Sequence, residues 1–145
     1  MPSIRILVVE DHVLVRQNLC TLLKAQPDMQ VIAEATDGLE AVRKAEEFQP
    51  DLVLLDIGLP ELSGLHATGL IKKAAPKAEI LVVTQYEEQF FARHAFAAGA
   101  LGFLTKTQAT AELIPAVRQV FAGKRFVSRK SQLESKDDDP PAGMA

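Results

Sequence analysis

The sequence has little of several features that mark particular classes of protein. It contains a single cysteine, Cys20, so no disulfide can form within the chain. It has no run of 18 apolar residues, and its N-terminus lacks the basic and then apolar pattern of a secretory signal. It also has no long basic stretch, and its net charge is −3. These absences predict a cytoplasmic protein that makes no contact with a membrane and no direct contact with DNA.

The composition is that of an ordinary globular domain. The chain has 145 residues, of which 48% are hydrophobic and 24% charged, enough to bury one real core. The apolar rhythm ends after Phe126, and the remaining stretch includes three aspartates at 137–139 and almost nothing that could pack. We therefore expect one domain over residues 1–126 and a linker or disordered tail over residues 127–145.

A short apolar run over residues 52–55 is the strongest indication of the fold. Four consecutive apolar residues are too few for a buried helix, and Pro50, Gly58 and Pro60 bound the run on both sides. Such a run is typical of a strand buried on both faces of a parallel sheet.

Apolar strand-like runs and helix-like periodicity alternate five times along the chain. The strand-like runs cover residues 4–9, 31–33, 52–55, 80–83 and 101–104. The alternation predicts an α/β fold with a doubly wound, five-stranded parallel sheet. Right-handed crossovers favour the flavodoxin-like strand order 2-1-3-4-5.

Polar side chains follow four of these strands at the point where each strand ends. Glu10 and Asp11 follow the first, Asp56 the third, Thr84 the fourth and Lys106 the fifth. Because the carboxyl ends of parallel strands meet at one edge of a sheet, we expect these side chains to share one site. Three carboxylates so close together repel one another unless a cation intervenes, and Mg²⁺ prefers oxygen ligands of this kind.

This set of groups fits phosphoryl transfer to an aspartate. Asp56 is the candidate nucleophile, because an aspartate can carry a phosphoryl group covalently. Lys106 offers a point charge and Thr84 a hydroxyl hydrogen bond to phosphoryl oxygens. Together with the metal, these groups supply the positioning and charge neutralisation that phosphoryl transfer needs.

Other interpretations fit the sequence less well. An aspartyl-phosphate phosphatase of the haloacid-dehalogenase class would have a second aspartate two residues after the nucleophile, where Gly58 stands. A flavin- or nucleotide-binding module would have a Gly-rich or Ser/Thr-rich loop after the first strand, where the chain is acidic instead. Each residue alone is also explained as a solvated acid, a turn cap or a surface lysine. Their convergence at one edge of the sheet favours the phosphoryl site.

The same residues resemble the receiver domain of bacterial two-component response regulators, and the resemblance covers about residues 3–125. It rests on the acidic pair Glu10-Asp11, on Asp56 with Pro60 and Gly64 downstream, on Thr84, and on the segment from Gly102 to Lys106. The stretches 9–12, 97–100 and 102–106 are most similar to the LuxR-type, NarL-like subgroup.

The resemblance implies that Asp56 is the phosphoacceptor and that a histidine kinase is the donor. Asp11 and Asp56 would be direct Mg²⁺ ligands, Glu10 would act through water, and the backbone carbonyl of Gly58 would be a further ligand. Such a domain is not an enzyme, except that it catalyses its own phosphorylation and slow dephosphorylation. Gly58 and Tyr86 stand at the positions that flank the hydrolytic water in this family, which leaves the phosphoaspartate lifetime open.

The resemblance also implies a switch and a set of partners. Thr84 and Lys106 would contact the phosphoryl group, and Phe103 would change rotamer on activation. The face made by the fourth helix, the fifth strand and the fifth helix would then bind a second receiver or an output domain. LuxR-type regulators carry a DNA-binding helix-turn-helix domain after the linker, and this sequence shows none. We expect either the receiver of a longer transcriptional regulator or a stand-alone receiver.

Overall fold

The structure, a computed structural model, describes residues 3–59, 63–85 and 89–128. Pro60, Tyr86 and the predicted tail from residue 129 onward, including the aspartates at 137–139, lie outside the described residues. None of the described helices has the length and apolar character needed to cross a bilayer.

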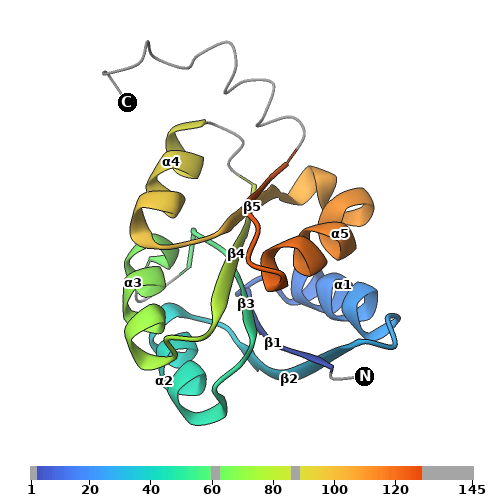
Figure 1. The fold of residues 1–145 in the computed structure, drawn as a ribbon, viewed down its shortest axis with the longest axis horizontal. Helices are drawn as coiled ribbons and strands as arrows, with labels where there is room; N and C mark the ends of the chain where they lie inside the picture. The colour runs from blue at the N-terminus through green and yellow to red at the C-terminus, as the bar shows by residue number, and fades with distance from the viewer. Residues whose placement is uncertain (1–2, 60–62, 86–88, 129–145) are drawn as a thin grey trace.

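Strands and helices alternate along the chain (Figure 1). The strands are β1 (Ile4–Val9), β2 (Met29–Ala35), β3 (Leu52–Leu55), β4 (Glu79–Thr84), β5 (Gly102–Thr105) and β6 (Phe126–Val127). The helices are α1 (Val13–Lys24), α2 (Gly38–Phe48), α3 (Gly64–Ala74), α4 (Gln89–Ala98) and α5 (Ala109–Phe121), with a 3₁₀ turn η1 (Lys106–Gln108) before α5. All pairings in the sheet are parallel, in the order β2-β1-β3-β4-β5-β6.

The predicted flavodoxin-like α/β fold and the order 2-1-3-4-5 are confirmed, but the sheet has six strands instead of five. The extra strand, β6, pairs through Gly102 with Phe126 and through Phe103 with Val127. A two-residue strand is too short to show alternation or a bounded apolar run, so periodicity could not reveal it. It straddles the domain limit predicted at residue 126.

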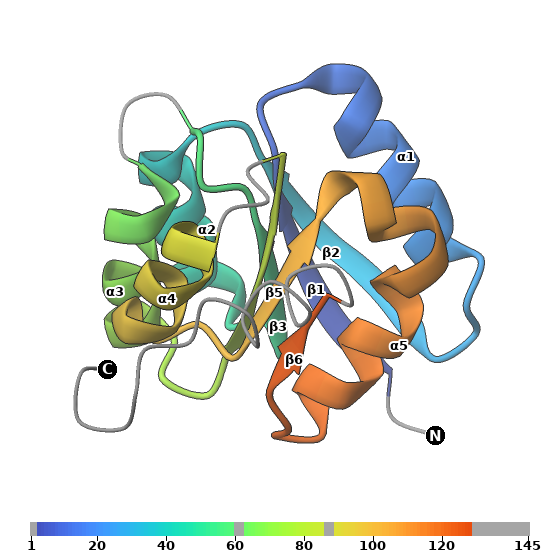
Figure 2. The ribbon, with the colours of Figure 1, turned by 90° about the horizontal axis from the view of Figure 1, so that it is seen from above.

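The helices cover both faces of the sheet, with α1 and α5 on one side and α2, α3 and α4 on the other (Figure 2). Strand β3 shows why the sheet needs both layers. Val53 and Leu55 belong to the core cluster on the α2–α4 side, while Leu52 and Leu54 belong to the cluster on the α1–α5 side. All four side chains are buried. The prediction of a strand buried on both faces is therefore confirmed.

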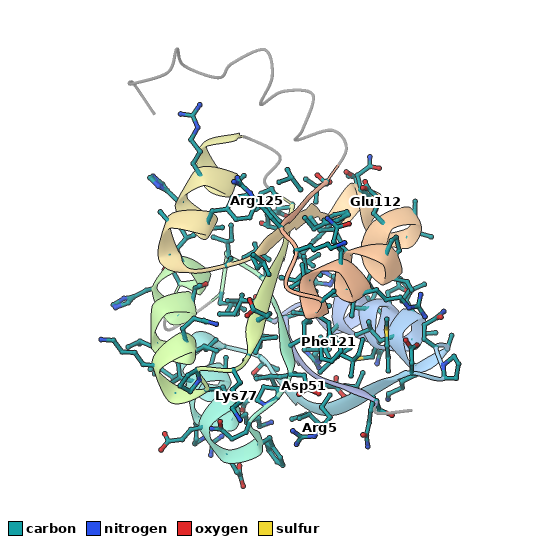
Figure 3. All side chains as sticks on the ribbon, in the orientation of Figure 1. Arg5, Asp51, Lys77, Glu112, Phe121 and Arg125 are labelled. Atoms are coloured by element: carbon teal, nitrogen blue, oxygen red, sulfur yellow. The ribbon has the colours of Figure 1, made fainter. Side chains whose placement is uncertain are left out.

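The amino end of β3 is tied to β1 by Arg5 and Asp51, which Figure 3 shows together at the same end of the domain. The Arg5 backbone N–H donates to Asp51 Oδ2 at 2.8 Å. The Arg5 guanidinium donates to the carbonyls of Phe48 and Gln49, both at 2.7 Å, at the end of α2. These bonds satisfy carbonyls that the helix terminus leaves open. They also fix where β3 starts. The start of the strand in turn sets the position of Asp56, which follows its opposite end.

Two glycines test how tightly this core is packed, and we predict effects of opposite sign. A Cβ at Gly102 would lie 2.6 Å from Leu81 Cδ1 and 2.7 Å from Val120 Cγ2, two buried side chains. Gly102→Ala should therefore lower the free energy of unfolding by about 1–3 kcal/mol, as overpacking does. A Cβ at Gly69, inside α3, would meet no atom within 4 Å.

Gly69→Ala should raise the free energy of unfolding by about 0.5–1 kcal/mol, because alanine is the better helix former. Urea denaturation of the two variants and the parent measures both values. A Gly102→Ala protein as stable as the parent would show that the contact between β4, β5 and α5 is looser than these distances indicate.

Candidate functional site

Two buried acids stand at the carboxyl ends of the neighbouring strands β1 and β3. Val9 and Leu55 are paired in the sheet, and the next residue along each strand is Glu10 or Asp56. The Asp56 N–H donates to the Val9 carbonyl at 3.1 Å, and the Glu10 N–H donates to the Ala35 carbonyl at 3.0 Å. Glu10 is 1% and Asp56 6% exposed. The sheet therefore places both carboxyl groups by backbone hydrogen bonds and holds them largely out of water.

A third acid, Asp11, completes the cluster from the exposed loop before α1. One carboxylate oxygen from each of Glu10, Asp11 and Asp56 lies within 4.8 Å of the others. Lys106 reaches this cluster from the end of β5. Its Nζ lies 2.7 Å from Glu10 Oε1 and 3.3 Å from Asp56 Oδ2. The predicted convergence of three acids and one lysine at a single edge of the sheet is thus what the structure shows.

Glu10 is the most constrained of the three acids. Its Oε2 accepts a hydrogen bond from the His12 N–H at 3.0 Å. Its Oε1 is buried and contacts the Lys106 ammonium as an ion pair, without a well-aligned hydrogen bond among the described residues. Burial raises the pKa of Glu10 above its ordinary value, although Lys106 and the His12 N–H act in the opposite direction.

The pKa of Lys106 is also raised. Burial acts to lower it, but the close contact with Glu10 and the negative charges of Asp56 and Glu10 outweigh that effect. Lys106 therefore stays an ammonium throughout the physiological range.

The cluster lines a hollow of about 200 Å³. Gly58 stands at its wall with an exposed backbone, and the Gly58 N–H donates to Asp56 Oδ1 at 3.2 Å. The two Asp56 oxygens thus have different partners, an amide on one side and the Lys106 ammonium on the other. The hollow is lined by Glu10, Asp11, His12, Asp56, Gly58, Gln85 and Lys106.

Two predicted switch residues lie outside the wall of this hollow. Thr84 ends β4 and is fully buried, paired in the sheet with Thr105, the residue before Lys106. Its neighbour Gln85 is the residue of that strand end that lines the hollow. Phe103 is fully buried in the core cluster on the α2–α4 side. Both residues therefore lie on the strands that lead to the site, behind its surface.

Two residues without a predicted role hold the loop that carries Glu10 and Asp11. His12 is the N-cap of α1, and its Nδ1 accepts a hydrogen bond from the Val15 N–H at 3.4 Å. Arg16, one helical turn later, donates from Nη1 to the Glu10 carbonyl at 2.9 Å, and its Nε lies 3.1 Å from Glu34 Oε1. A spacing of four residues, which places His12 and Arg16 on the same face at the start of a helix, is the sequence feature that could have indicated this role.

Fold and site together define a flavodoxin-like α/β domain with an acidic, lysine-paired pocket at the carboxyl ends of its central strands. The family model described as the response regulator receiver domain matches residues 6–118. The chain belongs to this family, and it is the receiver domain of a two-component response regulator.

Similar proteins agree with this assignment. The response regulator GacA of Pseudomonas viridiflava is 40% identical over 139 residues, 94% of this chain and 65% of that protein. A LuxR-family two-component response regulator from Aurantimonas sp. SI85-9A1 superposes with a TM-score of 0.89 at 38% identity, covering 93% of this chain and 96% of that one. The receiver domain of NarL from Mycobacterium tuberculosis superposes with a TM-score of 0.81 at 27% identity, covering 86% of this chain and 100% of that one.

The predicted resemblance to LuxR-type, NarL-like regulators is thereby confirmed. The chain spans 65% of the length of the GacA proteins that it matches.

The ion pair between Lys106 and Glu10 yields a prediction about pH. In Lys106→Met the hydrogen-bonding and charge effects of Lys106 that lower the pKa of Glu10 are lost, while the His12 N–H remains, so that pKa should rise further. A folded-state pKa above the unfolded value means that the folded protein binds more protons in the window between the two, so stability falls as the pH rises through it. Lys106→Met should therefore be destabilised more at pH 8 than at pH 5.

Urea denaturation at the two pH values measures this difference. Lys72→Met is a matched control, because Lys72 pairs at 3.9 Å with the partly exposed Glu79 away from the site. Its loss of stability should be the same at both pH values. Equal losses at pH 5 and pH 8 in Lys106→Met would contradict the assigned role of Lys106 in keeping Glu10 ionised.

Proposed function

We propose that Asp56 accepts a phosphoryl group from a histidine kinase in the cytoplasm. The observation that supports this proposal is the environment of the Asp56 carboxylate. One oxygen is held by the Gly58 N–H and the other lies 3.3 Å from the Lys106 ammonium, at the wall of a hollow. In the transfer, an Asp56 oxygen attacks phosphorus, the bond to the donor nitrogen breaks, and the donor imidazole departs with that electron pair. The product is an acyl phosphate on Asp56.

Lys106 and Thr84 would act on the transferred group. The Lys106 ammonium already faces Asp56, so it would pair with a phosphoryl oxygen without leaving the site. Thr84 ends the strand between β3 and β5, and we propose that its hydroxyl donates to a second phosphoryl oxygen. Beyond its own phosphorylation and slow dephosphorylation, we assign this domain no catalytic activity.

The donor groups of the pocket fit a magnesium ion. Three carboxylates cluster there, one buried oxygen of Glu10 lacks an aligned hydrogen bond within the described part of the chain, and Asp11 opens the cluster to water. Hard oxygen ligands with access for several waters are what Mg²⁺ requires. We propose Asp11, Asp56 and the Gly58 carbonyl as ligands, with Glu10 acting through water. When bound, the ion would neutralise charge on the phosphoryl group.

The output of the domain is proposed to be a change of protein–protein contacts. Phe103 is the residue that we propose to repack when Thr84 is drawn toward the phosphoryl group, since both lie on adjacent strands, β4 and β5. The relatives of this chain are longer proteins, and LuxR-family regulators are among its structural neighbours. We propose that the domain controls a DNA-binding output domain, with a second receiver as a further partner at the face of α4, β5 and α5.

The phosphoacceptor assignment predicts a single labelled site. Incubation with Mg²⁺ and acetyl phosphate should add one phosphoryl group to the protein, and Asp56→Asn should abolish the addition, because the amide is not a nucleophile toward phosphorus. Asp28→Asn is the matched control, since Asp28 pairs with Arg118 outside the pocket. Intact-mass spectrometry reads the result. Undiminished labelling of the Asp56→Asn protein would reject the assignment.

The metal assignment predicts a stabilisation that depends on Asp11. Magnesium at tenfold its Kd should add about 1.4 kcal/mol to the stability of the folded state by mass action. That corresponds to a rise in Tm of roughly 5 °C for a domain of this size. Asp11→Ala should lose this rise, whereas Asp28→Asn, which alters an acid paired with Arg118 at 3.0 Å, should keep it. Equal rises in Asp11→Ala and the parent, by differential scanning fluorimetry, would place the metal elsewhere.

A further inference from the structure

The segment from Lys124 to Ser128, which we call the β6 latch, is attached to the strand that carries Phe103. The Phe126 N–H donates to the Leu101 carbonyl at 3.1 Å, and the Ser128 N–H donates to the Phe103 carbonyl at 2.9 Å. Ser128 is fully buried. The latch therefore holds β5 through its backbone, at the residue proposed to move on activation.

The same latch is attached to α4 by a side chain. The Arg125 guanidinium carbon lies 3.9 Å from the centroid of the Phe96 ring, within the range of a cation–π interaction. Figure 3 shows Arg125 between the helices α4 and α5. The backbone around Arg125 is held by α5, because Gln119 Nε2 donates to the Arg125 carbonyl at 2.6 Å. The short segment thus connects α4, β5 and α5.

The two attachments meet in one core cluster. Phe96 is half-buried and packs against the cluster that contains Phe103. Ala92 and Ala95 of α4 belong to that cluster as well. A change in how Phe103 packs must therefore be accommodated by α4, which carries the ring under Arg125. If α4 and β5 shift relative to each other, the backbone bonds to β5 and the contact to Phe96 cannot both keep their geometry.

The latch also contains the shortest strand of the sheet, β6. It pairs through two residues, whereas each other strand has at least four, and both Phe126 and Val127 are half-buried at the sheet edge. Short edge segments open at lower free energy than central strands. A shift between α4 and β5 should therefore be relieved here before it disturbs the central strands.

We propose that the β6 latch opens when Asp56 is phosphorylated, freeing the edge of β5. The trigger rests on the function proposed above, because the phosphoryl group acts through Lys106, which directly follows β5. Phosphorylation at Asp56 would thus change the segment from Lys124 to Ser128 of the same domain. The face of α4, β5 and α5 becomes available to a partner only after the latch has left it.

Because of thermodynamic linkage, the opening can be tested either by adding a phosphoryl mimic or by weakening the latch. If a phosphoryl mimic opens the latch, then a change that weakens the latch must strengthen binding of the mimic by the same coupling. Arg125→Ala removes the cation, and Phe96→Leu removes the ring face but keeps an apolar side chain. Lys124→Ala is the matched control, because it alters an adjacent exposed cation in the same segment.

The experiment uses the full chain with Mg²⁺ and beryllofluoride as the mimic. Amide hydrogen exchange of Phe126 and Ser128 should speed up roughly fivefold or more when the mimic binds, the lower end of common coupling factors. Arg125→Ala and Phe96→Leu should speed up the same amides without the mimic and should bind beryllofluoride more tightly. Lys124→Ala should match the parent in both measurements.

The possible failures are distinct. Amide shifts at Asp11 and Asp56 with unchanged exchange at Phe126 and Ser128 would overturn the latch and leave the phosphoacceptor site standing. Unaltered beryllofluoride affinity in both Arg125→Ala and Phe96→Leu would overturn it in the same way. No response at Asp56 in any protein would overturn the proposed function and, with it, the trigger of the latch.

Discussion

The site depends on one interaction, the reach of Lys106 across the sheet to Glu10 and Asp56. The order of strands puts β4 between β5 and β3, and β1 lies beyond β3. A single ammonium at the end of β5 therefore joins the ends of two strands that are not its neighbours. Without it, three carboxylates would face one another at the end of a buried sheet, two of them largely withdrawn from water. The Lys106 ammonium that stabilises the pocket is also the group that a phosphoryl oxygen would bind in the proposed reaction. The carboxylates and the phosphoryl group would therefore compete for the same positive charge.

Under the proposed function, that competition would let a single phosphoryl group affect the rest of the domain. Three carboxylates against one ammonium leave the pocket negative, and a divalent cation is the natural counter-charge. A phosphoryl group on Asp56 would redistribute Lys106 among Glu10, Asp56 and the new oxygens. Because Lys106 directly follows β5, that redistribution acts on the strand that carries Phe103. The charge change is local, but it acts on a packed element, and packed elements move between discrete arrangements.

The sequence predicted those parts of the structure that follow from the periodicity of apolar residues, from the polar residues at strand ends and from side-chain charges. The buried run at 52–55 and the acids after it were enough to infer a parallel sheet with a pocket at one edge. Other features depended on contacts between residues distant in the chain. That Lys106 lies nearer to Glu10 than to Asp56, and that Thr84 is buried behind Gln85, are results of packing that no spacing encodes. The strand β6 was missed because its two residues become a strand only when β5 supplies the partner.

The central strands of this domain are held more firmly than the edge strand β6. This difference determines which part of the domain would move first. The acids are delivered by β1 and β3, central strands whose side chains are almost all buried and whose ends are fixed by backbone hydrogen bonds. At the other side of the sheet, β6 pairs with β5 through two residues at an edge, and beside it the exposed cation of Arg125 contacts the Phe96 ring. Strain introduced at the pocket therefore has little room to relax where it arises. Under the proposed latch it would relax at the edge of the sheet, where β6 pairs with β5 through two residues.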